Sequence, residues 1–318
     1  MDRLCLYLCL LSLVLFVPAQ AQNQEAAMPR VKSTVIRVPW HIYRFYPPDF
    51  SQYQNAALGF KGWESEVRDL DLSKTCLALM HLPDRGLTPD TEFSPDLPNP
   101  NLLGTVEDVP RTMEIVKFRL PRLVTAARAA GLQVAIIGVS ESVMKNTPLG
   151  RKCAKEAGAP PPADDTVVAL DQARWAAHDK DLYNLPLPTR PGYQPEPHLS
   201  GIPAVLRPQG HDLVACHSWQ LARLLKKRGI DHLIYCGYAL DECLWFEPCG
   251  MCDMKRRGFF CSAMRGGCVA IETKESCAGE RNLEYALWKT CSVFGYVFEL
   301  HELTSALREH AARLQESR

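Results

Sequence analysis

The sequence has no excess of charge of either sign, and this absence excludes several classes of partner. Its 318 residues include 36 Lys plus Arg and 36 Asp plus Glu, so the formal net charge at pH 7 is zero. Proteins that bind nucleic acid or an anionic surface through long-range electrostatics carry a basic excess. We therefore expect no nucleic-acid partner.

A long apolar run of the kind that spans a membrane is also lacking. The apolar run at residues 4–17 is shorter than the roughly 20 residues that a transmembrane helix needs. It follows a short charged start, and Ala19-Gln-Ala21 fits a small-x-small cleavage site. We interpret residues 1–21 as a secretory signal peptide and expect an exported, periplasmic or extracellular protein without a stable membrane span. Retention of an uncleaved signal as an anchor stays open.

Cysteine, in contrast, is abundant. Two of the thirteen cysteines, Cys5 and Cys9, lie in the signal, which leaves eleven in the mature chain. In an oxidising compartment several of these could pair, but an odd number leaves at least one free or paired between chains. That suits a free nucleophile, while the spacing leaves the connectivity of any disulfides open.

The chain then divides into an arm and one domain. Residues 22–70 are rich in aromatics and proline without a sustained period, and we interpret them as an irregular N-terminal arm. Residues 71–318 alternate strand-like and helix-like patterns, interrupted by two long loops at 82–108 and 141–210. Strands are predicted at 75–80, 132–138, 212–216, 231–237, 259–264 and 292–298, and helices at 111–130, 219–228, 244–257, 280–290 and 303–314. This alternation predicts a three-layer, doubly wound α/β fold with a mainly parallel sheet and helices on both faces.

Chemically versatile residues follow several of these strands. They are His81, Gly138-Val-Ser-Glu141, Cys216-His217 and the loop 237–243. Ligands bind at the carboxyl ends of the strands in such sheets, and those ends share one edge. The positions therefore predict a single site.

Cys243 is the most informative of these residues. It follows the predicted strand 231–237 and precedes the predicted helix 244–257. A thiol near the amino end of a helix lies in a field that favours the reactive thiolate. The alternative is that Cys243 is simply a small buried hydrophobic residue.

Three segments together resemble the isochorismatase-like cysteine hydrolases, a group that includes nicotinamidases, N-carbamoylsarcosine amidase and isochorismatases. They are Lys74-Thr-Cys-Leu-Ala-Leu-Met-His81, the helix and strand over 123–138, and the signature-like stretch 221–244, which ends in Gly-Tyr-Ala-Leu-Asp-Glu-Cys-Leu. The resemblance covers roughly residues 70–300. It implies hydrolysis of a small amide or related C–N bond, a small-molecule substrate, no cofactor and assembly into homo-oligomers.

The resemblance also implies roles for individual residues. Cys243 matches the nucleophile. Ala239 matches the residue after the family's cis peptide, so Tyr238–Ala239 is the candidate cis bond. The backbone N–H groups of Ala239 and Cys243 would then form an oxyanion hole, the kind of donor pair that stabilises an acyl-transfer intermediate.

Two departures from the family pattern leave the activity open. His81 stands where the family has its Asp, and Cys216 and His217 stand where it has its Lys. We predict that His81 is the general base, because a Cys–His pair can form a thiolate and carry its proton, and that His217 takes the place of the ammonium group. The alternative is a catalytically inactive scaffold that serves as an exported binding or assembly protein. The Asp/His metal cluster of nicotinamidases is not found, so no metal is expected.

Other motifs are better explained by structure than by chemistry. Cys249-Gly-Met-Cys252 has the C-x-x-C spacing, which we interpret as structural thiols or a disulfide. A thiol–disulfide activity is a third hypothesis, and zinc is disfavoured because Cys261 and Cys268 are spaced unlike a zinc knuckle. Trp245 and Phe246 are predicted to be core or interface residues and not a substrate clamp.

Overall fold

A computed structural model describes residues 34–51, 55–82, 111–112, 114–139, 141–162, 171–183 and 206–316. The predicted signal peptide and the loop over 83–108 lie outside these ranges. The described residues, from 34 to 316, belong to one unit. Among the residues described, none of the helices combines the length and the apolar character that a membrane crossing needs.

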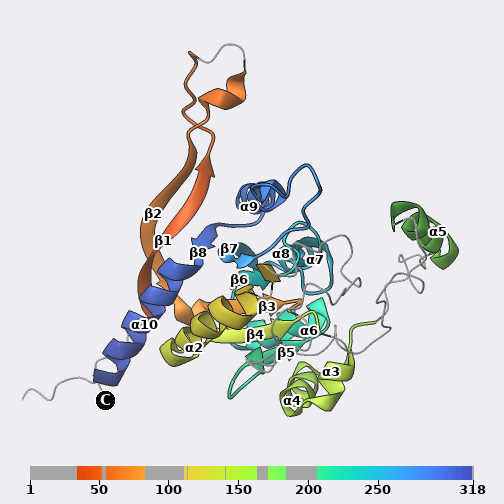
Figure 1. The fold of residues 1–318 in the computed structure, drawn as a ribbon. Helices are drawn as coiled ribbons and strands as arrows, with labels where there is room; N and C mark the ends of the chain where they lie inside the picture. The colour runs from red at the N-terminus through yellow and green to blue at the C-terminus, as the bar shows by residue number, and fades with distance from the viewer. Residues whose placement is uncertain are drawn as a thin grey trace, which may run out of the picture. The chain divides into compact units, whose positions relative to one another are not determined.

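An eight-stranded sheet with the order β2-β1-β8-β7-β6-β3-β4-β5 forms the centre of the molecule (Figure 1). The strands are β1 Val35–Arg44, β2 Gly62–Asp71, β3 Thr75–Met80, β4 Gln133–Ile137, β5 Leu213–Ala215, β6 His232–Gly237, β7 Phe260–Cys268 and β8 Val297–Glu299. Neighbouring strands from β8 through β5 are parallel, and β1 is antiparallel to both β2 and β8. The predicted α/β fold with a mainly parallel sheet is confirmed.

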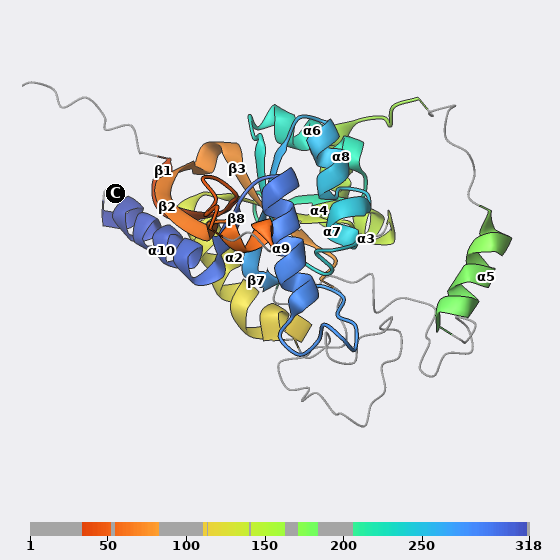
Figure 2. The ribbon, with the colours of Figure 1, turned by 90° about the horizontal axis from the view of Figure 1, so that it is seen from above.

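Helices cover both faces of this sheet. The helices are α2 Leu120–Ala130, α3 Glu141–Asn146, α4 Pro148–Ala157, α5 Gln172–Tyr183, α6 Ser218–Lys227, α7 Cys243–Phe246, α8 Met251–Arg256, α9 Arg281–Val293 and α10 Leu300–Glu316. One core packs α4, α6, α8 and α9 against the sheet, and a second core packs α2, α10 and the π-helix Ile115–Arg119 against the opposite face. Figures 1 and 2 show α2 and α10 side by side on that second face.

The interpretation of residues 22–70 as irregular is wrong for β1 and β2. These strands form a ladder of ten residue pairs, from Val35↔Asp71 to Arg44↔Gly62, and β1 joins the parallel part of the sheet through His41↔Val297. Only Ile36 and Val38 of β1 alternate as fully buried residues, and the rest of the strand is half-buried or exposed. The alternation of buried and exposed residues, by which a strand is recognised in sequence, therefore extends over too few residues of β1 to be detected. The folded unit consequently begins well before residue 71.

Two further predictions need correction. The stretch 141–210 is not a loop throughout, because it contains α3, α4 and α5. The predicted helix 244–257 is two short helices, α7 and α8, separated by the turn Glu247-Pro-Cys-Gly250. Pro248 has no N–H for a helical hydrogen bond, and Cys249 has a left-handed φ of 72°, so the helix cannot continue through them. The smaller differences are that α9 runs on to Val293, so that β8 starts at 297, and that β7 extends to Cys268.

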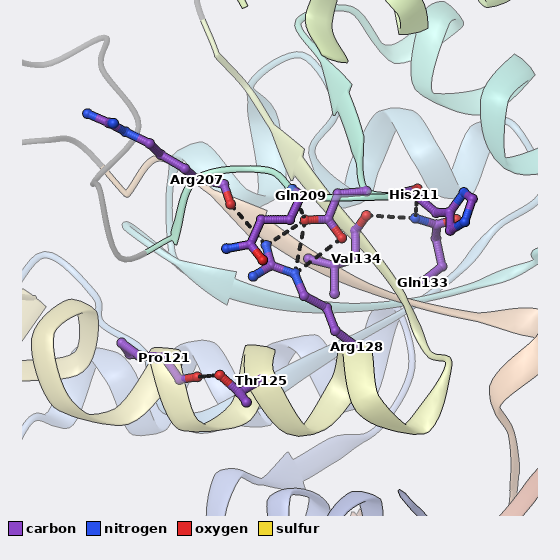
Figure 3. Close-up of polar contacts among 9 residues, drawn as sticks. Pro121, Thr125, Arg128, Gln133, Val134, Arg207, Gln209 and His211 are labelled. Carbon is purple, nitrogen blue, oxygen red and sulfur yellow. Dashed lines mark hydrogen bonds and ion pairs between the residues drawn. The ribbon is translucent and has the colours of Figure 1, made fainter. Parts of the chain in front are cut away.

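The amino-terminal edge of the sheet is held by an ion pair whose carboxylate is buried (Figure 3). Arg128, near the end of α2, donates from Nε and Nη2 to Asp212 Oδ2 at 3.1 and 2.5 Å. Nη2 also donates to the Arg207 carbonyl at 3.1 Å, and the Gln209 N–H donates to the same Asp212 oxygen at 2.9 Å. Asp212 directly precedes β5 and its side chain is only 5% exposed. The Asp212 carboxylate therefore has partners in both Arg128 and the Gln209 N–H, which anchors the start of β5 to α2.

Candidate active site

The carboxyl ends of β3 and β6 lie directly against each other. In the parallel pairing of these strands, Met80 is opposite Gly237, and the Tyr238 N–H donates to the Met80 carbonyl at 3.3 Å. Gly237 has a φ of 141°, and a Cβ there would lie 1.8 Å from the Met80 oxygen. Only glycine permits this approach. The result is that His81, after β3, and the loop that leads to Cys243, after β6, start from adjacent points on the same edge.

The loop 238–243 leads from the end of β6 to Cys243 at the start of α7. The Tyr238–Ala239 peptide bond is cis, the geometry expected at this position. The backbone N–H groups of Ala239 and of Cys243 lower the pKa of the thiol. The Ala239 carbonyl accepts from the Leu244 N–H at 2.9 Å, and the Leu240 N–H donates to the Val269 carbonyl at 2.8 Å, so the loop is fixed on both sides. The loop that carries the N–H groups predicted for an oxyanion hole is therefore held in place next to the candidate nucleophile.

The electrostatic environment of Cys243 differs from the sequence-based expectation. Burial raises the pKa of the thiol, and the charges of Glu247 and Glu242 raise it further, which outweighs the two backbone donors. The helix that was expected to favour thiolate is α7, which has only four residues. Its dipole is correspondingly weak, because the effect depends on aligned peptide units. The direction of this shift is opposite to the one that the sequence predicted for the thiol.

His81 is held in an uncommon backbone conformation with its ring directed at the sheet. Its φ is 48°, and a Cβ on Gly138 would lie 2.7 Å from both Cδ2 and Nε2 of the ring. Burial lowers the pKa of His81, while the charge of Glu247 and a backbone hydrogen bond with Gly138 partly oppose this shift. The lowered pKa favours the neutral imidazole, which is the form that can accept a proton from a thiol.

The residues at the position of the family's Lys lie farther along the sheet. Cys216 and His217 follow β5, which is separated from β6 by β3 and β4. The His217 Nε2 is 3.6 Å from Glu141 Oε1, and its ring stacks on Trp219 with centroids 6.0 Å apart. Burial, followed by the charge of Glu141, raises the pKa of Cys216. These contacts direct His217 toward α3 and α6, so the structure does not bring it to Cys243.

Sequence reasoning missed the carboxylates around the nucleophile. Glu242 and Glu247 both act on the Cys243 thiol, and Glu247 also acts on His81. Asp241 accepts from the Ile271 N–H at 3.0 Å, and burial raises its pKa to about 6. Pro248 was the signal that could have revealed Glu247, since a proline ends the helix just after it and turns the chain.

The remaining thiols do not form a second reactive centre in the described residues. All eleven cysteines outside the predicted signal are free, so Cys249 and Cys252 are not joined in a disulfide. Cys249 is fully buried, and burial raises its pKa to about 12, which disfavours thiol–disulfide exchange. No three His, Cys, Asp or Glu side chains within these ranges are grouped so as to hold a metal ion.

The two aromatic residues after the nucleophile have opposite environments. Trp245 is 7% exposed and donates its indole N–H to Thr290 Oγ1 at 3.1 Å, which makes it a core residue. Phe246 is 67% exposed. The expectation of a core or interface role is thus confirmed for Trp245, while for Phe246 an interface role stays a prediction.

Comparisons with known proteins give similarity only to solved structures. No family model matches the chain, and no curated protein matches it. The similar structures are isochorismatase-family cysteine hydrolases. A cysteine hydrolase from Pseudomonas syringae pv. phaseolicola is 15% identical with a TM-score of 0.46, and the match covers 76% of this chain and 95% of that one. An isochorismatase family protein from Burkholderia thailandensis is 16% identical with a TM-score of 0.40 over 74% and 96%.

A third structure in this set is a nicotinamidase/pyrazinamidase from Acinetobacter baumanii. It is 16% identical with a TM-score of 0.38, and the match covers 73% of this chain and 98% of that one. At such TM-scores these similarities carry no weight for the chemistry, which depends on the geometry of this chain.

Proposed function

We propose that the protein is a cysteine hydrolase that cleaves a small amide or a related C–N bond through Cys243. The observation that carries this proposal is the adjacency of the ends of β3 and β6, from which His81 and the loop to Cys243 start at neighbouring points. The backbone N–H groups of Ala239 and Cys243, in a loop held by hydrogen bonds on both sides, would suit the negative oxygen of a tetrahedral intermediate, because fixed donors need no reorganisation when the charge develops. His81, from the adjacent strand end, supplies a neutral base.

The first half of the reaction forms a thioester. The Cys243 sulfur attacks the carbonyl carbon, the electrons of the C=O bond move to oxygen, and His81 takes the thiol proton. The two N–H groups hold the oxyanion. The intermediate then collapses, the C–N bond breaks, and His81 returns the proton to the leaving nitrogen, which departs as ammonia or an amine.

The second half regenerates the thiol. Water attacks the thioester carbon while His81 takes a proton from it, and the C–S bond breaks. The sulfur recovers that proton, and a carboxylic acid is released. A raised pKa of the Cys243 thiol fits this scheme, since His81 can remove the proton at the moment of attack and no standing thiolate is required.

The competing function is that of an inactive scaffold that binds a ligand or partner. The observation in its favour is the raised pKa of Cys243, which results from burial and from two nearby glutamates. The absence of the family's Asp and Lys from the matching positions points the same way.

A panel of small primary amides, with release of ammonia as the readout, tests the proposal. We expect the wild-type protein to hydrolyse at least one member, and Cys243→Ala to lower kcat/KM by about 10³-fold or more, because the nucleophile is lost. The matched control is Cys277→Ala, which removes another half-buried free thiol that lies beyond β7. Hydrolysis that survives in Cys243→Ala would overturn the proposal.

A second readout separates inactivity from the wrong substrate. Iodoacetamide labelling of Cys243, followed over pH by mass spectrometry, should slow in His81→Ala if His81 accepts the thiol proton. A profile that is the same in both proteins, together with no hydrolysis, would favour the scaffold function.

A further inference from the structure

The strand β2, Gly62–Asp71, is at one end of the sheet, and within the described residues its outer side pairs with no other strand. Figure 1 shows it outside β1, away from the parallel strands. Its ladder with β1 runs through ten residue pairs without a bulge, and it contains neither proline nor lysine. Bulges, prolines and lysines are common means of keeping such an edge from pairing with another chain. The edge does carry other charged side chains, and their order decides what can pair with it.

Two hydrogen bonds define which backbone groups of β2 face outward. The Leu72 N–H, just after β2, donates to the Thr34 carbonyl, just before β1, at 2.8 Å. The Tyr43 N–H instead donates to Cys291 Sγ at 3.3 Å, away from β2. Hydrogen-bonded and non-hydrogen-bonded residue pairs alternate along an antiparallel ladder. The even-numbered residues of β1 and β2 therefore bond to each other, and the odd-numbered residues of β2 direct their N–H and C=O groups to the free edge.

Pro39 agrees with this alternation and identifies the centre of the edge. It is opposite Val67 in the ladder and has no N–H that could bond to β2. Both backbone groups of Val67 are consequently on the outer side of the strand. The Val67 side chain is also 49% exposed, although it is aliphatic. The middle of β2 thus offers a donor, an acceptor and an apolar side chain together.

The charges on either side of Val67 make β2 complementary to a second copy of itself. Arg68 donates from Nη2 to Glu66 Oε2 at 2.6 Å, and the two side chains are 36% and 58% exposed. When two β2 strands pair antiparallel with Val67 opposite Val67, the Glu66 of each copy is opposite the Arg68 of the other. Four charges of alternating sign then lie together, and each has an opposite charge both along its own strand and across the interface.

This register is distinguished from the other symmetric registers by its charges. Like charges directly opposite each other in a sheet are destabilising. Centres at 64, 66, 68 and 69 place a charged residue opposite itself, namely Glu64, Glu66, Arg68 or Asp69. Centres at 65 and 70 place Glu64 opposite Glu66 or Asp69 opposite Asp71. Between positions 64 and 70, only the centre at Val67 avoids every such pair.

We propose that β2 is a dimerisation strand, through which two copies of this chain join antiparallel about Val67 into one continuous sheet. The N–H and C=O groups of Val67 bond to the same groups of the second copy, and Ser65 pairs with Asp69 in the same way. The Glu66–Arg68 pairs are at the non-hydrogen-bonded positions between them, where opposite side chains approach most closely. The interface is two-fold symmetric, so it closes at two copies.

The test is the mass of the purified protein in solution, measured by sedimentation velocity over a range of concentrations. We expect wild type to form a dimer. Glu66→Arg and Arg68→Glu each place like charges opposite each other twice, so each should raise the dissociation constant of the dimer by about tenfold or more. Lys145→Glu is the matched control, because it disrupts an exposed ion pair with Glu141 on α3, and it should leave the mass unchanged. A wild-type protein that is monomeric at every concentration would overturn the inference.

Mixing the two charge variants separates a repelled interface from a damaged fold. In a mixed dimer of Glu66→Arg with Arg68→Glu, every arginine at these positions is opposite a glutamate. An equimolar mixture should therefore recover the dimer, although each variant alone is mainly monomeric. A mixture that stays monomeric would contradict the proposed register.

Val67→Pro tests the backbone part of the interface. The Val67 N–H faces outward, so proline there removes no hydrogen bond to β1, and edge strands tolerate it. The variant should keep its fold in circular dichroism but lose the central donors and dimerise about tenfold less tightly or worse. A dimer unchanged in both Val67→Pro and Glu66→Arg uses another surface and refutes the proposal. Slow hydrogen exchange of the Val67 amide in a monomer would also refute it, since another segment of the same chain would then cover the edge.

Discussion

The two edges of the sheet handle charge in opposite ways. At the amino-terminal edge, the buried carboxylate of Asp212 is paired with Arg128 and also accepts a backbone N–H. At the carboxyl-terminal edge, the charges that act most on the Cys243 thiol are two glutamates, Glu247 and Glu242, and both are acidic. A chain with zero net charge has therefore separated its charges locally.

We infer from this difference that the amino-terminal edge contributes mainly to stability and the carboxyl-terminal edge mainly to chemistry. Paired charges at a buried edge resist separation, because breaking the pair leaves an isolated charge out of water. Like charges around a thiol and a histidine cost stability, but they shift the pKa values on which proton transfer depends. The amino-terminal edge is thus expected to respond to mutation through unfolding, and the carboxyl-terminal edge through reactivity.

The largest effect is expected at the Arg128–Asp212 pair. Arg128→Met leaves Asp212 buried without its partner, so the free energy of unfolding should fall by about 3–5 kcal/mol. Urea denaturation measures this change, while the iodoacetamide profile of Cys243 in the folded protein should stay the same. Arg37→Ala is the control, because Arg37 pairs with Asp69 where both side chains are 73% exposed, and it should cost about 0.5 kcal/mol or less. A similar loss in both variants would contradict the contrast between buried and exposed pairs.

A smaller loss of stability with a change in reactivity is expected at Gly250. Gly250→Ala places a methyl group 2.7 Å from the Glu247 carbonyl oxygen, so the turn must shift at a cost of about 1–3 kcal/mol. The labelling rate of Cys243 should change with it. Gly258→Ala, at the other end of α8, has a φ of 88° but open space around its Cβ. It should cost about 1 kcal/mol through backbone strain and leave labelling unaltered. Equal labelling rates of Cys243 in wild type and Gly250→Ala would show that the 247–250 turn does not influence the reactivity of the thiol.

The pH dependence of stability sharpens the comparison at the amino-terminal edge. Burial lowers the pKa of His232, at the start of β6, from 6.5 to about 4. Between these values the unfolded chain binds the extra proton, so stability falls as the pH drops from about 6.5 to about 4, by at most about 1.4 kcal/mol per pH unit. In denaturation curves measured over this pH range, His232→Gln should reduce the loss of stability at low pH, and substitution of the exposed His211 by Gln should not. If the loss is unchanged in His232→Gln, then His232 is not its cause.

The opposite dependence of stability on pH is expected at the carboxyl-terminal edge. Burial raises the pKa of Asp241 from 3.8 to about 6, and the charges of Glu242 and Glu272 add to this shift. Between these values the folded protein holds the extra proton, so the contribution of Asp241 to stability falls as the pH rises and is constant above about pH 6. Asp241→Asn should remove this component, which is smaller than that of His232 because Asp241 is only partly buried. Asp69→Asn, at an exposed carboxylate, serves as the control, and an identical pH profile in Asp241→Asn and wild type would contradict the shift.

Much of the parallel sheet was predictable from sequence, because its strands are short and continuously apolar. All six residues of β3 and all six of β6 are buried, and an apolar run follows the first residue of each strand, Thr75 or His232. The place of Cys243 just after β6 followed from the same pattern. The β1–β2 pair was missed since its residues are mostly half-buried, and its contacts, such as Trp40 with Tyr296 and Phe298, join segments more than 250 residues apart.

The sequence by itself determined the α/β alternation and the position of the candidate nucleophile, because apolar runs and Gly–Cys spacing are local properties of the chain. Only the tertiary structure decided that His217 lies with Glu141, and that burial and the charges of two glutamates raise the pKa of the Cys243 thiol. Burial and electrostatic neighbours come from segments that are distant in sequence, and a pKa depends on their sum. These effects on the pKa act together only after the strands have paired and the turn at Pro248 has formed.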